Sequence, residues 1–437
     1  MSLGNVIQKG LRLVAIEQET RSSRKMMSRK RLIPFLVILI SGLTGALQET
    51  VPAVQRAAES APAAPIVIPF ELVTRHILIK VRINNSDPLS FIFDTGDKVA
   101  IVDLERARSL GLNLQGEVNV GGAGPGTLRG SYVREASLSV VGVEGTKQPV
   151  VLAIPLQAMQ SRFGHDIDGI IGGDFIKQFV VEVDYPARVL RLRDRDKFVY
   201  SGSGEIVPMN LNSGGHPIIS AEVTVTGRPA IKGKFIVDLG SGFSLALHSP
   251  FVEQQGLLES TPKTIKALGG GGAGGRVSGR TGRVAELKIG KFQIENPLTL
   301  FSQDKAGAFA SSELQGNIGQ MILSKFTVLL DYARDRIILE PNASLKEPIV
   351  PALGGLRLVA EGADYKTFRV EELVDDSPAT EAGLQKDDII LVVDRLPTSG
   401  MSLSTLIETL NQPVPHRLSV SRAGKTLQIA LTPRRII

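Results

Sequence analysis

One motif, present twice in the chain, constrains the fold more than any other feature. Residues 89–94 read Leu-Ser-Phe-Ile-Phe-Asp and continue as Thr95-Gly96. Residues 233–238 read Gly-Lys-Phe-Ile-Val-Asp and continue as Leu239-Gly240. Each copy therefore places an aspartate directly after an apolar run and shortly before a glycine. A sequence that repeats on this scale builds its fold from two similar units.

Two further landmarks repeat in the same order. Residues 170–194 align with residues 317–341, and Asp184-Tyr185 in the first segment matches Asp331-Tyr332 in the second. Between the aspartate motif and this segment, each copy also contains a glycine-rich stretch. Landmarks that match in one order indicate an internal duplication. The glycines that we expect in mobile loops are Gly121, Gly122 and Gly124 in the first copy and Gly270, Gly271 and Gly272 in the second.

The two copies are predicted to be mainly β-structure. Short runs such as 77–83 and 180–183 are rich in Val, Ile and other branched residues and are bounded by Gly, Pro, Asn or Asp, which is typical of strands. No long apolar pattern with a helical period occurs there. We expect only one short helix in each copy, near residues 174–178 and 320–325. The expected lobes are residues 67–200 and 205–342.

Two such aspartates suit a chemistry that needs paired carboxyl groups. The glycine of each motif lets the backbone turn sharply at the end of its strand. If the loops of Asp94 and Asp238 meet across a pseudo-twofold axis, the two carboxyl groups lie so close that they share one proton. One group then takes a proton from a water while the other protonates a carbonyl oxygen or a leaving nitrogen. The glycine-rich stretches are expected to be flaps that close over a substrate and exclude water.

With these residues the chain resembles the retroviral-type (retropepsin-like) aspartic proteases, with two copies fused in one chain. The resemblance implies two tandem β-barrel lobes, a catalytic pair formed by Asp94 and Asp238, and neither a cofactor nor a metal. The family's motif of two apolar residues and a glycine, behind the catalytic loop, matches Ile170-Ile171-Gly172 but only Asn317-Ile318-Gly319 in the second copy. The residues that the resemblance implies as support for the catalytic loops are Thr95, Gly96, Gly240 and Ser241.

Three positions bear on whether such a pair is active. Leu239 stands where the family has a threonine that hydrogen-bonds between the two loops, so we expect this contact on one side only. Asp97 replaces the usual Ala or Ser after the glycine, and a third carboxylate raises the affinity of the pair for protons unless Lys98 offsets its charge. Ser241 is expected to be able to donate a hydrogen bond to a carboxylate.

Residues 345–437 resemble a PDZ domain, and the chain as a whole is similar to bacterial aspartyl protease family proteins that carry a C-terminal PDZ domain. The resemblance lies in Ser377-Pro378-Ala379, in Ala382-Gly383-Leu384 and in Asp388 with Ile390. It implies a β-sandwich with short helices, whose edge strand binds a C-terminal or extended peptide. The implied peptide-binding residues are Leu353, Gly354, Gly355, Leu356 and Leu358.

A helix is predicted over residues 402–411. Its apolar residues recur at helical spacing, and Ser402 is a suitable cap at its start. We expect this helix to form the second wall of the peptide groove, with its apolar positions in the core. The PDZ family usually has Gly at the position of Asp387. We expect positive φ there, which Asp tolerates better than most residues do.

The N-terminal sequence predicts that the protein is exported. The net charge of the chain is +6, and residues 1–31, with eight Lys or Arg and two Glu, account for all of it. The apolar run 32–47 completes a signal or anchor segment over residues 1–47, either a cleaved signal peptide or an uncleaved membrane anchor, with a buried helix as the third interpretation. We expect a flexible linker over 48–66 and translation from Met26 or Met27. The protein is therefore expected in the periplasm or cell envelope, either secreted or anchored by its N-terminal segment.

Composition excludes several other classes of protein. Because the excess charge lies at the N-terminus, the remaining chain is neutral and offers no basic surface for nucleic acid. The chain has no Cys, which excludes disulfides and Cys-ligated zinc, and its five His show no metal-binding spacing. Asn212-Ser213-Gly214-Gly215 resembles the nucleophile motif of trypsin-like proteases. The histidines that precede it, His76 and His165, are not in a matching context.

The sequence thus predicts an exported, two-lobed aspartic endopeptidase with a C-terminal PDZ domain, acting on peptide or protein substrates. One alternative is a non-catalytic peptide-binding protein of the cell envelope built on the same lobes. Another is a homodimeric protease in which Asp94 of one chain pairs with Asp94 of a second.

Overall fold

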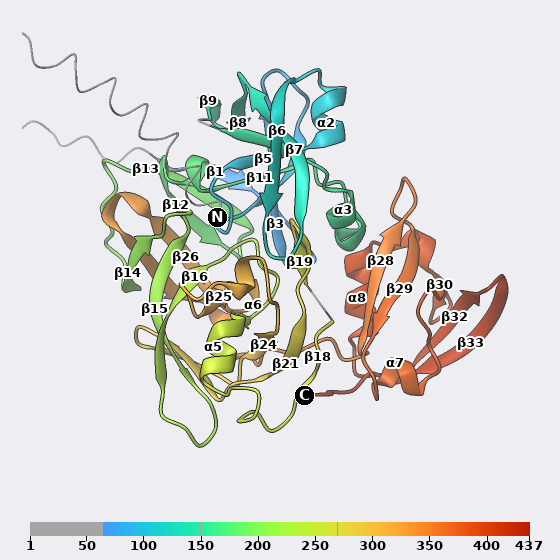
Figure 1. The fold of residues 1–437 in the computed structure, drawn as a ribbon. Coiled ribbons are helices and arrows are strands. Elements are labelled where there is room, and N and C mark those ends of the chain that lie inside the picture. Colours follow the sequence, from blue (N-terminus) through green and yellow to red (C-terminus); the bar gives the residue numbers. More distant parts are fainter. Residues whose placement is uncertain (1–63, 149, 269) are drawn as a thin grey trace, which may run out of the picture. The chain divides into compact units, whose positions relative to one another are not determined.

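The computed structural model describes residues 64–148, 150–268 and 270–437. The expectations for the signal or anchor segment and for nearly all of the linker lie outside these residues. Within the described part the secondary structure is dominated by strands, as Figure 1 shows, and the prediction of a mainly β protein is confirmed. No helix in these described ranges is both long enough and apolar enough to cross a membrane.

The first copy of the repeat consists of thirteen strands and three short helices in the described residues. Its strands are β1 (Ile66–Pro69), β2 (Glu71–Val73), β3 (His76–Ile83), β4 (Leu89–Phe93), β5 (Ala100–Asp103), β6 (Asn113–Gly121), β7 (Thr127–Arg134), β8 (Ser137–Val140), β9 (Val143–Lys147), β10 (Val151–Ile154), β11 (Gly169–Ile171), β12 (Phe179–Asp184) and β13 (Val189–Asp194). Its helices are α2 (Leu104–Ser109), α3 (Gln157–Phe163) and α4 (Gly173–Ile176).

The second copy follows the same plan. Its strands are β14 (Glu205–Leu211), β15 (Pro217–Thr224), β16 (Ile231–Val237), β17 (Leu245–Leu247), β18 (Ile265–Lys266), β19 (Gly271–Gly272), β20 (Gly275–Arg276), β21 (Gly279–Arg283), β22 (Glu286–Ile289), β23 (Phe292–Glu295), β24 (Leu298–Ser302), β25 (Gly316–Ile318), β26 (Phe326–Asp331) and β27 (Arg336–Pro341). Its helices are α5 (Ser249–Gln254) and α6 (Gln320–Leu323), with 3-10 turns η1 (Ala308–Ala310) and η2 (Tyr332–Arg334).

The expectation of one short helix per copy is wrong in number. The helices at α4 and α6 lie where the sequence placed them, but α2, α3 and α5 are additional. Each of these extra helices has only six or seven residues, which is too short to show a helical repeat of apolar residues. Helix α2 has instead a local signal, because the Asp103 side chain accepts a hydrogen bond from the Arg106 amide and caps its first turn.

One sheet joins the two copies. Strand β12 pairs antiparallel with β26, Val183 lying opposite Val328. The continuous order β1-β13-β12-β26-β27-β14 therefore passes from three strands of the first copy to three strands of the second. A single hydrophobic core extends through both copies, with Phe93 and Phe235 fully buried in it. The duplicated units are thus fused into one packed structure, which fixes their aspartate motifs relative to each other.

Residues 356–431 form a separate six-stranded sheet with its own core. The elements of this C-terminal module are β28 (Leu356–Glu361), β29 (Thr367–Leu373), α7 (Pro378–Glu381), β30 (Ile389–Val393), β31 (Leu396–Pro397), η4 (Thr398–Gly400), α8 (Leu403–Leu410), β32 (His416–Arg422) and β33 (Lys425–Leu431). The predicted helix is confirmed as α8, where the Ser402 hydroxyl accepts a hydrogen bond from the Thr405 amide. Asp387 has φ 70°, as expected.

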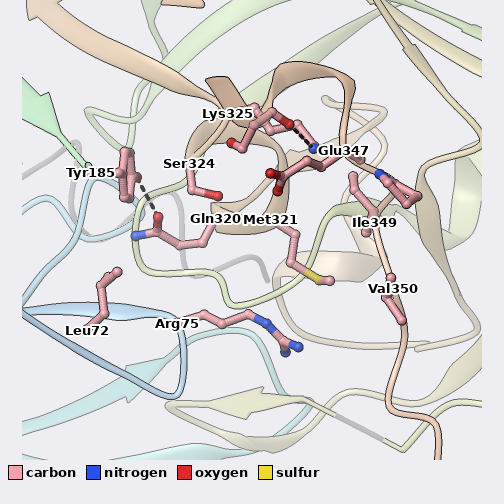
Figure 2. Close-up of a pocket in the computed structure, with 12 residues that line it drawn as sticks. Leu72, Arg75, Tyr185, Gln320, Met321, Ser324, Lys325, Glu347, Ile349 and Val350 are labelled. Carbon is pink, nitrogen blue, oxygen red and sulfur yellow. Dashed lines mark hydrogen bonds between the residues drawn. The ribbon is translucent and has the colours of Figure 1, made fainter. Parts of the chain in front are cut away.

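The 3-10 turn η3 (Ala343–Lys346) and the segment after it connect the second copy to the module. The buried Lys325 secures this connection, because its Nζ donates to the carbonyl oxygens of Ser344 (2.8 Å) and Glu347 (2.6 Å). A pocket of about 330 Å³ lies alongside, between the β2–β3 turn, α6 and the connecting segment. Figure 2 shows Arg75 and Gln320 at its walls.

Candidate active site

The two aspartate motifs occupy equivalent places in the two copies. Strand β4 runs parallel to β11 and β16 runs parallel to β25. Immediately after these strands, the Asp94 amide donates to the Ile171 carbonyl (3.1 Å) and the Asp238 amide donates to the Ile318 carbonyl (2.9 Å). All five residues of β4 are buried, so the apolar run fixes the strand in the core and the aspartate emerges at its end.

The two loops meet, and their carboxyl groups surround two glycines. A Cβ atom placed on Gly96 would lie 2.8 Å from Asp238 Oδ1 and 3.0 Å from Asp94 Oδ1. A Cβ atom on Gly240 would lie 2.0 Å from Asp94 Cγ. Only glycine fits at these two positions, because any side chain would occupy the space of the carboxyl groups. Asp94 and Asp238, called the dyad below, therefore share one site within a single chain.

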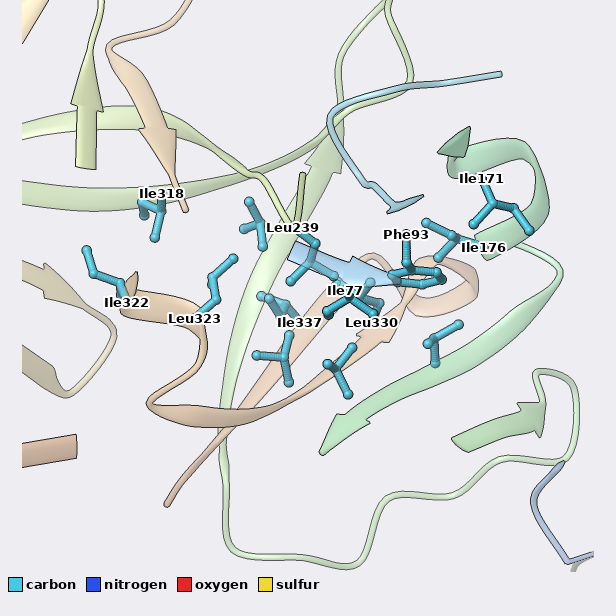
Figure 3. Packing of buried hydrophobic residues seen from close by; sticks show 14 of the residues in the cluster. Ile77, Phe93, Ile171, Ile176, Leu239, Ile318, Ile322, Leu323, Leu330 and Ile337 are labelled. Atoms are coloured by element: carbon cyan, nitrogen blue, oxygen red, sulfur yellow. The ribbon is translucent and has the colours of Figure 1, made fainter. Parts of the chain in front are cut away.

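Thr95 ties the two loops together. Its hydroxyl donates to the Val237 carbonyl (2.6 Å) and accepts from the Leu239 amide (2.9 Å). Leu239 contributes no such bond in return; its side chain is fully buried in the apolar core, where Figure 3 shows it among Phe93, Ile318 and neighbouring residues. The contact between the loops is one-sided, as expected from the sequence.

A second contact replaces the missing half of this arrangement. The Gln320 side chain donates from Nε2 to the Leu239 carbonyl (2.5 Å), and its Oε1 accepts from the Tyr185 hydroxyl (2.5 Å). The equivalent of Gln320 in the first copy is Gly173, which has no side chain to offer. The hydroxyl of Tyr332, the counterpart of Tyr185, is buried and has no protein partner in the described residues. The support of the two loops is therefore asymmetric.

Proximity and burial favour protons on the dyad. Burial, followed by the nearby charges of Asp238 and Asp97, raises the pKa of Asp94 well above its usual value. Burial also raises the pKa of Asp238, while hydrogen bonds from the Asn317 side chain and two backbone amides oppose the rise. Two coupled carboxyl groups of this kind hold one proton between them over a wide pH range.

Asp97 adds a third carboxyl group near the dyad. Burial and then the charge of Asp238 raise its pKa to about 6. Lys98 does not offset this charge, because its exposed side chain extends across Gly215 in the second copy. The Asp97 and Lys98 carbonyls accept hydrogen bonds from the Gly173 (2.8 Å) and Asp174 (2.7 Å) amides, and these bonds fix the loop.

Ser241 does not bind a carboxylate through its hydroxyl in the described structure. Its backbone amide is directed at Asp238, and its carbonyl accepts from the Gln320 amide (2.8 Å).

His76 lies against this loop, since a Cβ on Gly242 would be 2.9 Å from its ring. Burial lowers the pKa of His76 to about 4, so this ring is neutral near neutral pH.

The glycine-rich stretches form hairpins whose tips bind each other. In the first copy β6 and β7 form the hairpin, and in the second copy β18 and β21 do, with β19 and β20 at its end. The Gly124 amide donates to the Ala273 carbonyl (3.2 Å), and the Gly126 amide donates to the Gly274 carbonyl (2.8 Å). Gly122 accepts from the Ala308 amide (3.0 Å), whereas Gly121 has open space around it.

The glycines of the second hairpin lie against both copies. Gly270 packs on the Phe243 ring, Gly271 lies beside the Arg162 guanidinium, and Gly272 faces Ala123 of the first hairpin. The two hairpins are thus closed against each other in this structure.

Sequence reasoning missed one side chain that reaches the dyad, Asn317, and a second that contacts it, His248. Asn317 donates from Nδ2 to Asp238 Oδ2 (2.7 Å), and the buried His248 contacts the other end of the Asn317 amide. Asn317 was noted only as a departure from an apolar motif, and no pattern in the sequence connects it to His248. The two meet because β17 and β25 are neighbouring strands.

The predicted peptide-binding residues lie at the start of the C-terminal module. The Gly354 and Gly355 carbonyls accept from the Ala379 (2.9 Å) and Val374 (2.8 Å) amides, and Leu353 accepts from the Arg434 amide (3.2 Å). Leu356 begins β28, and Leu358 within it is buried in the module core. In the strand order β28 is at one end of the sheet, with β29 as its neighbour, so no strand of the described residues pairs with its other edge.

Comparison with known proteins agrees with the duplication. A protein-family model described as aspartyl protease matches residues 79–175 and again residues 221–323. No curated protein matches the chain. The two matched regions contain the two aspartate motifs and most of the strands around them. Two regions of the chain are therefore similar to aspartyl proteases, which supports the duplication seen in the sequence and in the fold.

Proposed function

We propose that the protein is an aspartic endopeptidase whose catalytic residues are Asp94 and Asp238. The observation that carries this proposal is the meeting of the two carboxyl groups around Gly96 and Gly240. The family match to aspartyl protease in both copies supports a protease-like function. The proposed substrate is an extended peptide or protein segment that lies between the dyad and the two glycine-rich hairpins.

The proposed reaction needs only the dyad and one water. The ionised carboxylate takes a proton from the water as its oxygen attacks the peptide carbonyl carbon, and the protonated partner gives its proton to the carbonyl oxygen. The tetrahedral diol then collapses: the first carboxyl gives its proton to the leaving nitrogen, the second recovers a proton from the diol, and the C–N bond breaks. Both groups return to their starting states.

We further propose that the C-terminal module is a PDZ domain that binds a peptide along β28. The unpaired edge of this strand, the adjacent helix α8 and the loop of Gly354 and Gly355 support this assignment. The chain is proposed to work in the cell envelope, delivered there by residues 1–47.

Proteolysis by the purified full-length chain tests the proposal. Wild type, Asp94→Asn and Asp238→Asn are incubated with an unfolded protein from acid to neutral pH. Cleavage by wild type that both substitutions abolish is the expected result. Loss with Asp94→Asn alone would instead favour a homodimer built on Asp94, which gel filtration would detect. A wild type that binds peptides but never cleaves them would leave a peptide-binding protein as the function.

A further inference from the structure

The carboxylate of Asp238 accepts a hydrogen bond from a side chain, and the equivalent position beside Asp94 is apolar. Asn317 is the central residue of β25 and pairs with Ile236 of β16. In the first copy Ile170 takes this place in β11, paired with Ile92 of β4. The Asn317 Nδ2 lies 2.7 Å from Asp238 Oδ2. The duplicated site thus has a polar residue on one side only.

The direction of each hydrogen bond follows from the chemistry of its atoms. A carboxylate only accepts, so the Asn317 nitrogen faces Asp238 and its Oδ1 faces away. His248 Nε2 lies 2.9 Å from this Oδ1. Because the amide oxygen only accepts, His248 carries its proton on Nε2 and donates it. Burial lowers the pKa of His248, which favours the neutral ring, and the shorter of its two contacts assigns the proton to Nε2, since Nδ1 lies 3.3 Å from the Ser311 carbonyl oxygen.

His248 is placed for this contact at the expense of a local one. It is only 2% exposed and occupies the N-cap position of α5, yet its side chain makes no capping hydrogen bond there. In the first copy Asp103 takes the N-cap position of α2 and does cap it, through the Arg106 amide. The His248 ring instead turns towards Asn317 and packs 5.3 Å from the Phe309 ring. The second copy has therefore exchanged a helix cap for a buried contact with Asn317.

We propose that Asn317 and His248 are positioning residues that hold the negative charge of the dyad on Asp238 and leave its proton on Asp94. Asn317 supplies one more hydrogen bond to an ionised Asp238 than the first copy supplies to Asp94, and His248 fixes the amide in that orientation. Hydrogen bonds to a charged acceptor are stronger than those to a neutral one. This inference rests on the proposed function, and it assigns Asp238 as the base that takes the proton of the water and Asp94 as the acid.

Other groups around Asp238 do not reverse this preference. The charges of Asp238 and Asp97 raise the pKa of Asp94, and the charge of Asp238 raises that of Asp97, whereas burial is the cause that raises the pKa of Asp238. The Gly240 amide donates to Asp238 (3.1 Å) and the Gly96 amide donates to Asp94 (2.6 Å), so the backbone serves both sides. The titratable groups that face the dyad from neighbouring elements are Asp97, His76, His216, Tyr332 and, through Asn317, His248.

The pH dependence of cleavage by the full-length chain tests the assignment. Asn317→Leu removes the donor, so the pKa of Asp238 rises and the acid limb of kcat/KM moves to higher pH by about one unit. Ile170→Leu, the apolar exchange at the equivalent position, is the matched control, and its acid limb keeps the wild-type midpoint. His248→Phe moves the acid limb of kcat/KM in the same direction as Asn317→Leu. His248→Gln retains an N–H donor, so its acid limb keeps the wild-type midpoint.

A second readout separates this inference from the proposed function. Carboxyl ¹³C NMR of aspartate-labelled chain, with Asp238 assigned from Asp238→Asn, follows its titration whether or not the protein cleaves peptides. A higher midpoint in folded Asn317→Leu supports the positioning role even if no variant is a protease. An unchanged midpoint, or an equal change in Ile170→Leu, overturns it. Circular dichroism establishes that each variant is folded.

Discussion

At the scale of single residues, the surroundings of Asp97 disfavour the ionised form of its carboxyl group. Its carboxyl group is half-buried and adjoins Asp238, and its pKa is raised to about 6. Between its usual value and this one, the unfolded chain has lost the proton while the folded chain retains it. The folded state is therefore disfavoured progressively as the pH rises through this window, and the full cost is present above pH 6.

Replacing Asp97 removes that cost. We expect Asp97→Asn to raise the free energy of unfolding by about 1–3 kcal/mol at pH 7.5 and to leave it unchanged near pH 3.5. Urea unfolding at the two pH values measures the difference. Asp87→Asn, at an exposed aspartate in the segment between β3 and β4, is the control for a change of net charge. An equal gain at both pH values would mean that Asp97 costs stability through packing and not through its charge.

Thr95 is the residue on which the joining of the two loops depends. Thr95→Val keeps the shape but leaves the Val237 carbonyl and the Leu239 amide without their buried partner. We expect a loss of about 2–4 kcal/mol in the free energy of unfolding, since two buried backbone groups lose a hydrogen bond. Thr95→Ser retains the hydroxyl and should lose much less. Similar losses in the two variants would show that the methyl group matters more than the hydroxyl.

The residue scale is also where prediction from sequence reaches its limit. Asp94 and Asp238 were expected to meet because a repeated motif at the end of a buried strand places both carboxyl groups at one axis. The one-sided contact of Thr95 was expected because Leu239 stands where the resemblance implies a threonine. The contact of His248 with Asn317 did not follow, because it depends on the rotation of a ring at the junction of β17 and α5. Only the paired strands bring these residues together.

At the scale of elements, runs of branched residues were enough to locate strands such as β3 and β12, and apolar spacing was enough to locate α8. The short helices α2, α3 and α5 were not found, because one or two turns do not display a period. The glycine-rich stretches were expected to be flaps, and in the structure they form hairpins; the mutual binding of their tips is a tertiary contact that composition does not encode. The contact between the hairpin tips can therefore be tested separately.

Gly124 provides that test. It is buried at the tip of the first hairpin, and a Cβ there would lie 2.5 Å from the Gly274 carbonyl oxygen. Gly124→Ala should force the tips apart and break the bonds to Ala273 and Gly274. Hydrogen exchange over residues 122–126 and 271–276 should then become roughly tenfold faster. Gly121→Ala, where the added methyl group meets open space, should leave exchange unchanged; if Gly124→Ala also does, the tips are not held by these bonds.

At the scale of the whole molecule, the C-terminal module contacts both copies of the repeat. The turn after α3 lies against the module, where a Cβ on Gly164 would be 2.6 Å from Leu403 and 3.2 Å from Ala360. These two residues belong to α8 and β28, the walls of the proposed peptide groove. The Thr74 amide also donates to Ser404 (3.3 Å), and the Tyr365 hydroxyl donates to Asp166 (3.1 Å). The first copy thus covers the end of the groove that is distant from Gly354 and Gly355.

Ion pairs connect the module to the hairpin of the second copy. Arg276 in β20 pairs with Glu371 and Glu372 of β29, and Lys266 in β18 lies 3.4 Å from Glu372. Both glutamates are more than four-fifths buried, and Arg357 of β28 binds them from within the module. Because the same hairpin carries Ala273 and Gly274, the segment that we propose to cover the substrate is held at its other side by the module. No pattern in the sequence predicted this connection, since Arg276 and Glu372 lie 96 residues apart in the chain.

We therefore expect the module to stabilise the closed hairpin through Arg276. Arg276→Met, which keeps the apolar stem, should speed hydrogen exchange at residues 271–276 and show a coupling energy of about 0.5–1 kcal/mol with Glu371→Gln in a double-mutant cycle of unfolding. Added salt should shrink this coupling, because Arg276 is partly exposed. Arg129→Met removes the same charge from the hairpin of the first copy and should not couple to Glu371. A coupling of equal size for Arg129, or none for Arg276, would mean that the module and the hairpin lie together without stabilising each other.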